Sequence, residues 1–152
     1  MEKIPEVDAA KTLMMEAVSW SVMKWLREKK RVRKAADQAN AALDQLGQAV
    51  KDRWPGSVRD AYTSLVTQRS GNATVPSQPT AVINPHSRLT AKKVKEADDA
   101  AYRARMDAEE TFDEAERQLS TSLAREGCRK AIQSWELHEK AIRRAEALLP
   151  PR

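Results

Sequence analysis

The sequence contains few of the residues that build a wide globular core. It has four tryptophans, two tyrosines and one phenylalanine in 152 residues, while 32% of its residues are charged. A chain of this composition buries its apolar side chains most easily in a narrow seam between helices. We therefore expect an elongated helical protein that forms one domain.

Other absences limit the chemistry and the compartment. The single cysteine, Cys128, excludes an internal disulfide. We interpret it as a small seam residue, with a reactive thiol or an intermolecular disulfide as the alternative. The sequence has no long uncharged apolar run, and its first eight residues are acidic and include a proline. We therefore expect no transmembrane segment and no secretory signal, and a cytoplasmic protein for which non-classical export stays open.

Helix-breaking residues are confined to a few places. The stretches 6–54 and 90–149 contain none of the seven prolines and only two of the four glycines. Both are rich in Ala, Glu, Lys, Arg, Leu and Gln, which favour helix. As continuous helices they would span about 74 Å and about 90 Å. The predicted fold class is therefore all-α, an elongated antiparallel coiled-coil-like hairpin of two long helices.

A Pro-Gly pair ends the first predicted helix after Trp54, because a proline disfavours helical geometry in the preceding residue. A capping-box pattern over 57–60 then predicts a short helix at 57–69. The next segment, 70–89, holds three prolines and one glycine among Ser, Thr and Asn. It is predicted to be an irregular connector that leads into the second long helix.

The first long stretch has the clearer apolar pattern. Eleven positions from Met15 to Val50 alternate steps of three and four residues, and ten of them are apolar, with Lys29 as the exception. This spacing is typical of coiled-coil packing, in which a lone polar residue selects register or oligomer state. The predicted helix seam consists of Met15, Val18, Val22, Trp25, Val32, Ala36, Ala39, Leu43, Leu46 and Val50.

The apolar pattern of the second stretch changes phase by one residue. The change falls at Leu119 and Leu123, and Gly127 follows closely. We interpret it as a stutter, where the supercoil of a continuous helix locally unwinds. Gly127 is expected to mark a kink or a close helix contact.

Two segments carry opposite charge, and they leave two helix registers open. Residues 24–34 contain seven basic residues and one acid, and 96–116 contain nine acids and two bases. If the two helices align so that these charged segments face each other, the apolar end of the second helix stays uncovered in a single chain. If the helices overlap along their full length, that end is covered but the charged segments are separated. Burying a large side chain contributes about 1.5–3 kcal/mol, more than an exposed ion pair at about 0–1 kcal/mol. We therefore favour full overlap in a monomer, and the charge-matched register if a second chain covers the overhang.

The first helix is apolar on more than one side near its start. Leu13 and Trp20 project roughly opposite to the seam residues Val18, Val22 and Trp25. A helix that is apolar all round is usually buried in a larger bundle. We therefore predict a homodimeric four-helix assembly, or a protein partner, at this end. The candidate self-association residues are Leu13, Met14, Ala17, Trp20 and Met23.

The basic segment is the strongest candidate contact surface for an anionic partner. It wraps more than one helix face, so acids of the same chain can neutralise only part of it. Phosphate contacts would give salt-dependent, sequence-independent binding to nucleic acid. The alternatives are a solvated face with intraprotein ion pairs, an acidic protein, and peripheral contact with anionic lipid, since an apolar segment precedes it. The candidate contact residues are Lys24, Arg27, Lys30, Arg31, Arg33 and Lys34.

We find no constellation of residues that suggests catalysis. Three residues before His86 and His138 stand Ile83 and Trp135, so the Glu-x-x-His metal motif of helical bundles is absent. Cys128 lies about three helical turns from His138, too far for a nucleophile–base pair within one helix. We expect no enzymatic activity, no cofactor and no bound metal.

Residues 54–62, with the sequence WPGSVRDAY, resemble the Trp-x-Gly turn of the small helical-hairpin proteins that type VII secretion systems export. That resemblance implies two antiparallel helices joined at this turn, a dimer, export from the cell, and no catalytic residues. This chain is longer than the family's pattern. The family's export signal, a tyrosine followed four residues later by an acid, is missing because Val66 follows Tyr62 and Met106 follows Tyr102.

These observations together predict a non-enzymatic helical interaction or assembly protein that acts through self-association or a partner helix. The first alternative is a sequence-independent nucleic-acid-binding subunit that uses the basic segment 24–34. The second alternative is a protein similar to the type VII-secreted helical hairpins.

Overall fold

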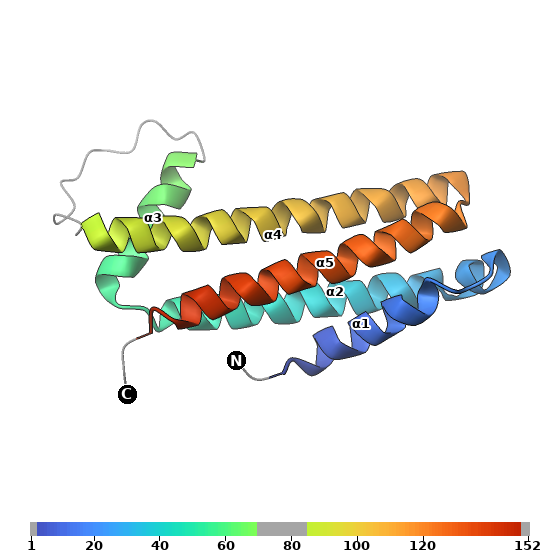
Figure 1. Ribbon diagram of the computed structural model, residues 1–152, viewed down its shortest axis with the longest axis horizontal. Helices are drawn as coiled ribbons and strands as arrows, with labels where there is room; N and C mark the ends of the chain where they lie inside the picture. Colours follow the sequence, from blue (N-terminus) through green and yellow to red (C-terminus); the bar gives the residue numbers. More distant parts are fainter. Residues whose placement is uncertain (1–2, 70–84, 150–152) are drawn as a thin grey trace.

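The computed structural model describes residues 3–69 and 85–149, and in these ranges the regular secondary structure is entirely α-helical (Figure 1). The all-α prediction is thus confirmed. The helices are α1 (Pro5–Ala17), α2 (Val22–Asp52), α3 (Gly56–Arg69), α4 (Pro85–Gln118) and α5 (Thr121–Glu146).

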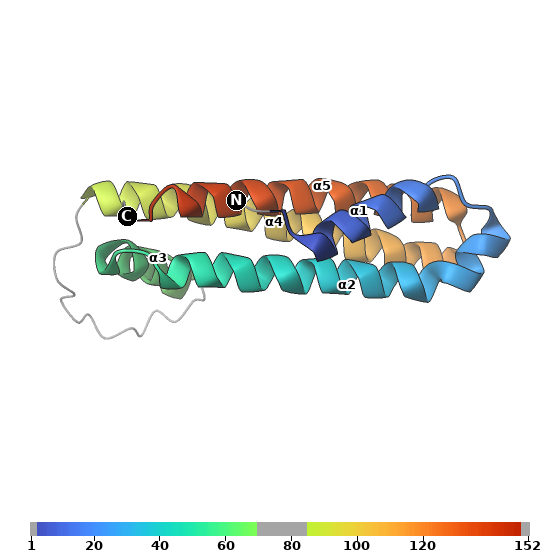
Figure 2. The same ribbon diagram turned by 90° about the horizontal axis from the view of Figure 1, so that it is seen from below.

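Four helices run along the long axis of the molecule, and α3 crosses α4 at one end (Figures 1 and 2). α1 and α2 are antiparallel neighbours joined by a short turn, and so are α4 and α5. α5 packs against α1, α2 and α4 and therefore lies at the centre of the bundle. α1 is short, so it covers only part of the length of α2 and α5 (Figure 2).

The prediction of one continuous helix over 6–54 is wrong at residues 18–21, where the chain reverses. The Ser21 hydroxyl accepts a hydrogen bond from the backbone N–H of Lys24 (3.2 Å), which is an N-cap contact that starts a new helix. The hydroxyl of Ser19 donates to the carbonyl of Glu16 (2.9 Å) at the end of α1. Two serines around Trp20 thus supply the polar contacts that let the chain turn without glycine or proline.

The continuous helix predicted over 90–149 is also wrong, because the chain reverses at Leu119 and Ser120. Leu119 has a φ of 50°, a left-handed conformation that is unfavourable for a leucine. Ser120 caps α5 by accepting a hydrogen bond from the N–H of Leu123 (3.2 Å). The phase change in the apolar pattern therefore marks a helical hairpin, and the stutter interpretation is replaced.

These two reversals remove the conflict between the two registers. α4 lies beside α2 with its acids near the basic segment, and Asp113 accepts a hydrogen bond from Arg33 (2.8 Å). Further along, Asp44 accepts two hydrogen bonds from Arg105 (2.7 and 3.0 Å). α5 folds back against both α2 and α4, so its apolar end is covered within one chain and no second chain is needed for it.

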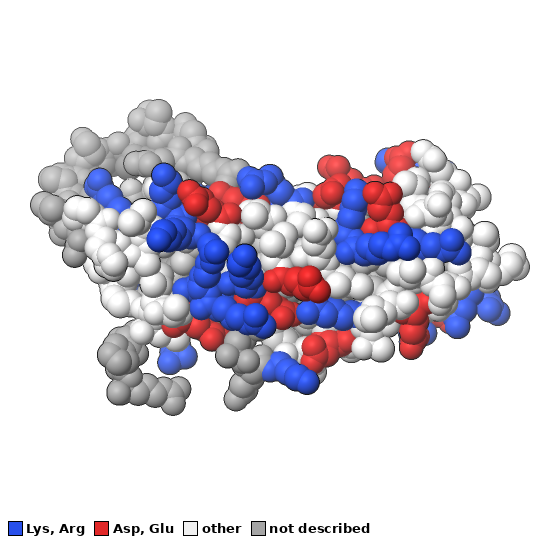
Figure 3. Space-filling view, viewed as in Figure 1, with Lys and Arg blue, Asp and Glu red and all other residues white. Residues whose placement is uncertain are grey.

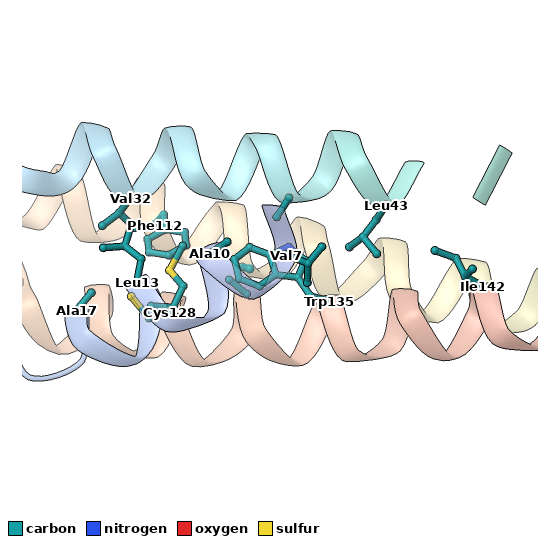
Figure 4. Packing of buried hydrophobic residues seen from close by; sticks show 14 of the residues in the cluster. Val7, Ala10, Leu13, Ala17, Val32, Leu43, Phe112, Cys128, Trp135 and Ile142 are labelled. Carbon is teal, nitrogen blue, oxygen red and sulfur yellow. The ribbon is translucent and has the colours of Figure 1, made fainter. Parts of the chain in front are cut away.

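The core runs along the axis between α1, α2, α4 and α5 (Figure 4). The Trp25 and Phe112 rings stack with centroids 6.1 Å apart, and the Trp135 indole N–H donates to the Asn40 side-chain oxygen (2.9 Å). Among the ten predicted seam residues, Met15 and Val22 are exposed because they flank the reversal. Five are buried and the other three pack half-buried against the core; the buried ones are Trp25, Val32, Ala39, Leu43 and Val50.

The short helix predicted at 57–69 is confirmed as α3. Its preceding Trp54 is buried, donates its indole N–H to the Ala145 carbonyl (2.7 Å), and packs edge-on against Tyr62. Most of the predicted connector, 70–84, lies outside the described residues, and 85–89 are helical instead of irregular. α3 crosses α4 and does not lie antiparallel along α2, so the hairpin implied by the type VII resemblance is not formed at this turn (Figure 1).

None of the helices in the described ranges has the length and apolarity needed to span a membrane.

Gly127 allows α4 and α5 to approach closely, as the sequence suggested. A Cβ at this position would lie 2.9 Å from two ring carbons of Phe112. Gly127→Ala should therefore destabilise the protein by about 1–3 kcal/mol through overpacking. Gly47→Ala is the matched control, since its Cβ would lie 3.7 Å from Ile142, an ordinary contact. The control should be neutral or gain up to about 1 kcal/mol. Urea unfolding measures the free energy of unfolding of both variants, and an equal change in the two would contradict the prediction.

Candidate interaction surface at the α1–α2 end

The structure buries most of the predicted self-association residues within the single chain. Four of them are 7% exposed or less because α1 folds back onto α2 and α5, namely Leu13, Met14, Ala17 and Trp20. The fifth, Met23, is 70% exposed. The sequence pattern was correctly interpreted as a helix buried in a bundle, but the chain itself forms that bundle. The first four residues therefore form core contacts and leave Met23 as an available contact residue.

Exposed apolar side chains nevertheless gather at this end. The turn between α1 and α2 and the turn between α4 and α5 both lie there (Figure 1). Five of the eight large apolar residues that are exposed in the described part of the chain belong to these segments. We call them the apolar tip, which consists of Met15, Val22, Met23, Leu26 and Leu119. An apolar group of this kind on a protein surface usually marks an interaction site.

The basic segment of α2 is only partly neutralised. Arg33 pairs with Asp113 and Glu116 of α4 and lies over the Phe112 ring, so it is part of the fold. Lys24 lies over the Trp20 ring, 5.3 Å from its centroid, and Arg31 lies 3.6 Å from Glu28. Of the four that remain, Lys29 is half-buried, and the other three are exposed and make no ion pair within the described residues. We call them the cationic stripe, which consists of Arg27, Lys30 and Lys34.

α4 presents acids beside this stripe. Asp113 keeps a side-chain exposure of 52% although it binds Arg33. Glu110 is exposed and Glu109 half-buried, and neither makes an ion pair with another described residue. We call Glu109, Glu110 and Asp113 the acidic row. The attraction predicted between the two charged segments is therefore present at Arg33 but leaves unpaired charge of both signs on the outer surface.

A second group of basic residues escaped the sequence analysis. The face formed by α4, α5 and α1 shows Lys and Arg side chains over the last turns of α5 and the adjoining start of α4, with acids between them (Figure 3). The exposed basic residues of these segments include Lys92, Lys93, Lys140, Arg143 and Arg144. They are far apart in sequence, and only the α4–α5 hairpin brings them together. Their net charge is lowered by neighbours such as Glu139, which lies 3.8 Å from Arg143.

A polar cleft of about 380 Å³ lies between α2 and α4, with α5 as its floor. At the wall of the cleft, the Asp98 carboxylate accepts a hydrogen bond from the Tyr62 hydroxyl (2.5 Å) and forms an ion pair with Lys51 (2.7 Å). Burial, reinforced by the bond to Asp98, raises the pKa of the Tyr62 phenol well above its usual value. Tyr62 is therefore a neutral donor, and the cluster ties α3 to α2 and α4.

His138 lies in the same cleft, and its Nε2 is buried without a hydrogen-bond partner among the described residues. Burial, with the nearby Arg105 guanidinium as the second cause, lowers the pKa of His138 to about 4. The imidazole is therefore neutral at physiological pH. Because Arg105 is bound to Asp44, the cleft contains an ion pair next to an uncharged ring.

Cys128 is buried in the core, where burial raises the pKa of its thiol to about 12. The thiol is therefore neutral and inaccessible, as the seam interpretation predicts, and a reactive thiolate is disfavoured. Within the described residues no group of three or more His, Cys, Asp or Glu side chains is arranged to hold a metal ion.

Comparison of the chain with protein-family models, with curated proteins and with solved structures finds no match.

The lowered pKa of His138 predicts a pH-dependent stability. The ordinary pKa of histidine is about 6.5, so between about pH 6.5 and pH 4 the unfolded chain binds a proton that the folded chain does not. The stability is full above about pH 6.5 and falls as the pH drops through this window, by at most about 3 kcal/mol. His138→Gln should flatten the difference between Tm at pH 7 and at pH 5. His86→Gln is the control, since His86 is exposed. An equal difference between Tm at pH 7 and at pH 5 for the two variants would contradict the burial of a neutral imidazole.

Proposed function

We propose that the protein is a non-enzymatic helical interaction or assembly protein. It acts through the α1–α2 end, by self-association or by binding a partner helix. The observation that carries the proposal is the apolar tip, in which side chains from three segments are exposed together at one end of the bundle. Met15 and Met23 are 69% and 70% exposed. A monomer gains no stability from apolar side chains in that environment, whereas an interface does.

The partner surface is expected to combine apolar and charged contacts. Met23 lies on the same face of α2 as Arg27 and Lys30, because residues four and seven apart share a helix face. An interface of this kind has an apolar centre and a charged rim, and the rim charges favour the correct partner and speed association. At high salt the complex should therefore persist, but it should form more slowly.

Light scattering after size-exclusion chromatography tests the self-association form of this proposal. The expected mass is that of two chains of 17.1 kDa, at both low and high salt. Met23→Lys should shift the mass to one chain without changing helical content, because Met23 is exposed and its removal leaves the core intact. Leu89→Lys is the matched control, an exposed apolar residue at the opposite end of the bundle, and should leave the mass unchanged. A single-chain mass for the unmodified protein would rule out self-association.

A second candidate function is sequence-independent binding of nucleic acid by the cationic stripe. It is supported by the exposure of Arg27, Lys30 and Lys34, which lack ion-pair partners in the described part of the chain. It is weakened by the acidic row, which lies on the neighbouring helix and would repel phosphates.

Electrophoretic mobility at low salt tests this candidate. If nucleic acid is the partner, Lys30→Glu with Lys34→Glu should abolish a shift that the unmodified protein produces, because these residues would contact phosphate. Lys140→Glu, an exposed residue on α5, is the control for net charge. An unmodified protein that leaves the nucleic acid unshifted would remove this candidate.

A further inference from the structure

The outer surface of α2 and α4 near the apolar tip carries two rows of side chains with the same spacing. Each row follows the i, i+4, i+7, i+11 pattern of one helix face. The row on α2 consists of Met23, Arg27, Lys30 and Lys34. The row on α4 consists of Tyr102, Met106, Glu109 and Asp113. One row is apolar and basic and the other is apolar and acidic.

The contacts within the chain fix the relative heights of the two rows. Arg33 reaches Asp113 at 2.8 Å, and Asp44 reaches Arg105 at 2.7 Å, so residue numbers at equal height on the antiparallel helices sum to about 146–149. By this relation Lys34 lies level with Asp113, one turn from Glu110. The basic part of α2 and the acidic part of α4 therefore lie side by side at the same level of the bundle.

Such a face is complementary to itself. A two-fold axis parallel to the helices keeps every residue at its own level and places α2 of one copy over α4 of the other. Lys34 then faces Glu110 and Asp113 of the second copy, and the same contacts occur a second time by symmetry. The Arg33–Asp113 pair shows that charges of these two helices attract at this level.

We propose that the α2–α4 face binds a second copy of this chain and forms a parallel, isologous dimer with both apolar tips at the same end. This inference rests on the proposed function and names its partner and its interface. Leu26 and Met23 lie level with and just beyond the α4–α5 turn of the second copy, so they border the interface at the tip end. Tyr102, which is 57% exposed although it is aromatic, becomes covered further along it.

The available surface is large enough for a stable dimer. α2 has 31 residues and is about 46 Å long, and its residues 29–52, about 36 Å, lie level with α4. Two helices side by side are about 20 Å wide, so the shared face measures about 700 Å², within the range of about 600–1,000 Å² per partner in a standard interface.

A second copy fits this face better than nucleic acid does. A polyanion would meet the acidic row as well as the cationic stripe, whereas a second copy offers a basic row to the acids and an acidic row to the bases. Asp37 is the exception on α2, since it is exposed and level with Glu110 of the second copy. Its replacement by lysine is therefore expected to tighten the dimer.

A charge-exchange experiment tests the interface. Lys34→Glu places an acid opposite Glu110 and Asp113 of the second copy, and Glu110→Lys places a base opposite Lys34, so each variant alone should lose at least tenfold in dimer affinity. An equimolar mixture should regain the affinity, because the acid introduced at position 34 of one chain then faces the base introduced at position 110 of the other. The control pair is Lys140→Glu and Glu136→Lys, both exposed on the outer side of α5, which should leave dimerisation unchanged. Sedimentation equilibrium measures all these affinities.

The outcomes separate this inference from the proposed function. A dimer that is disrupted by Met23→Lys but not by Lys34→Glu would overturn the α2–α4 interface and leave the proposed function standing. A protein that is monomeric throughout would overturn this inference and the self-association form of the proposed function, and would leave the partner helix as the form that still stands. Restoration of the dimer only in the mixture would support the interface, since neither nucleic acid nor lipid can produce that pattern.

The parallel orientation has its own test. Arg59 is exposed at the end opposite the apolar tip, and Arg59→Cys can be spin-labelled selectively because the native thiol of Cys128 is buried. In the parallel dimer the two labels lie within about two bundle widths, about 50 Å. Contact between the tips alone would separate them by at least two lengths of α2, about 90 Å. A measured distance of about 90 Å or more between the labels would overturn the parallel arrangement.

Discussion

Burial of the apolar face of α5 is the constraint on which the rest of the structure depends. Three helices, α1, α2 and α4, pack against it, and its buried residues include Trp135, Ile142 and Cys128. The buried residues of α5 form a wide helix face, which one neighbouring helix cannot cover by itself. The chain therefore reverses twice, so that helices from both halves of the sequence surround α5. The ion pairs between α2 and α4 follow from this arrangement and do not cause it, since each contributes little on an exposed surface.

The location of helical structure could be predicted from the sequence, because glycine and proline are nearly absent from two long stretches and punctuate the region between them. The two reversals could not be predicted in the same way. Neither contains glycine or proline, and each depends on a serine cap, at Ser21 and Ser120, which costs little to leave unused in a continuous helix. The phase change at Leu119 was the available evidence for the second reversal. Its misinterpretation as a stutter shows that periodicity alone does not distinguish a slip from a turn.

The candidate surface was predicted in part. Its charged residues were identified because a run such as 24–34 is evident in the sequence, and Met23 was named. The apolar tip was not identified as a group, because Met15 and Val22 fit a continuous seam until the chain reverses between them. Burial of Trp20 and Leu13 depends on the same reversal. The basic group on α4 and α5 arises from segments about fifty residues apart, so only the fold brings it together.

The shortness of α1 has a kinetic consequence. This helix has 13 residues, and outside its buried face it is attached to α5 by the Lys11–Glu139 ion pair. A short helix at one edge of a bundle opens more readily than the whole molecule unfolds. Its departure would uncover an apolar groove between α2 and α5 that Val7, Ala10, Leu13 and Met14 otherwise fill. Amide hydrogens of α1 should therefore exchange with solvent faster than those of α5, and the uncovered groove would be a site where chains exchange their first helices during folding.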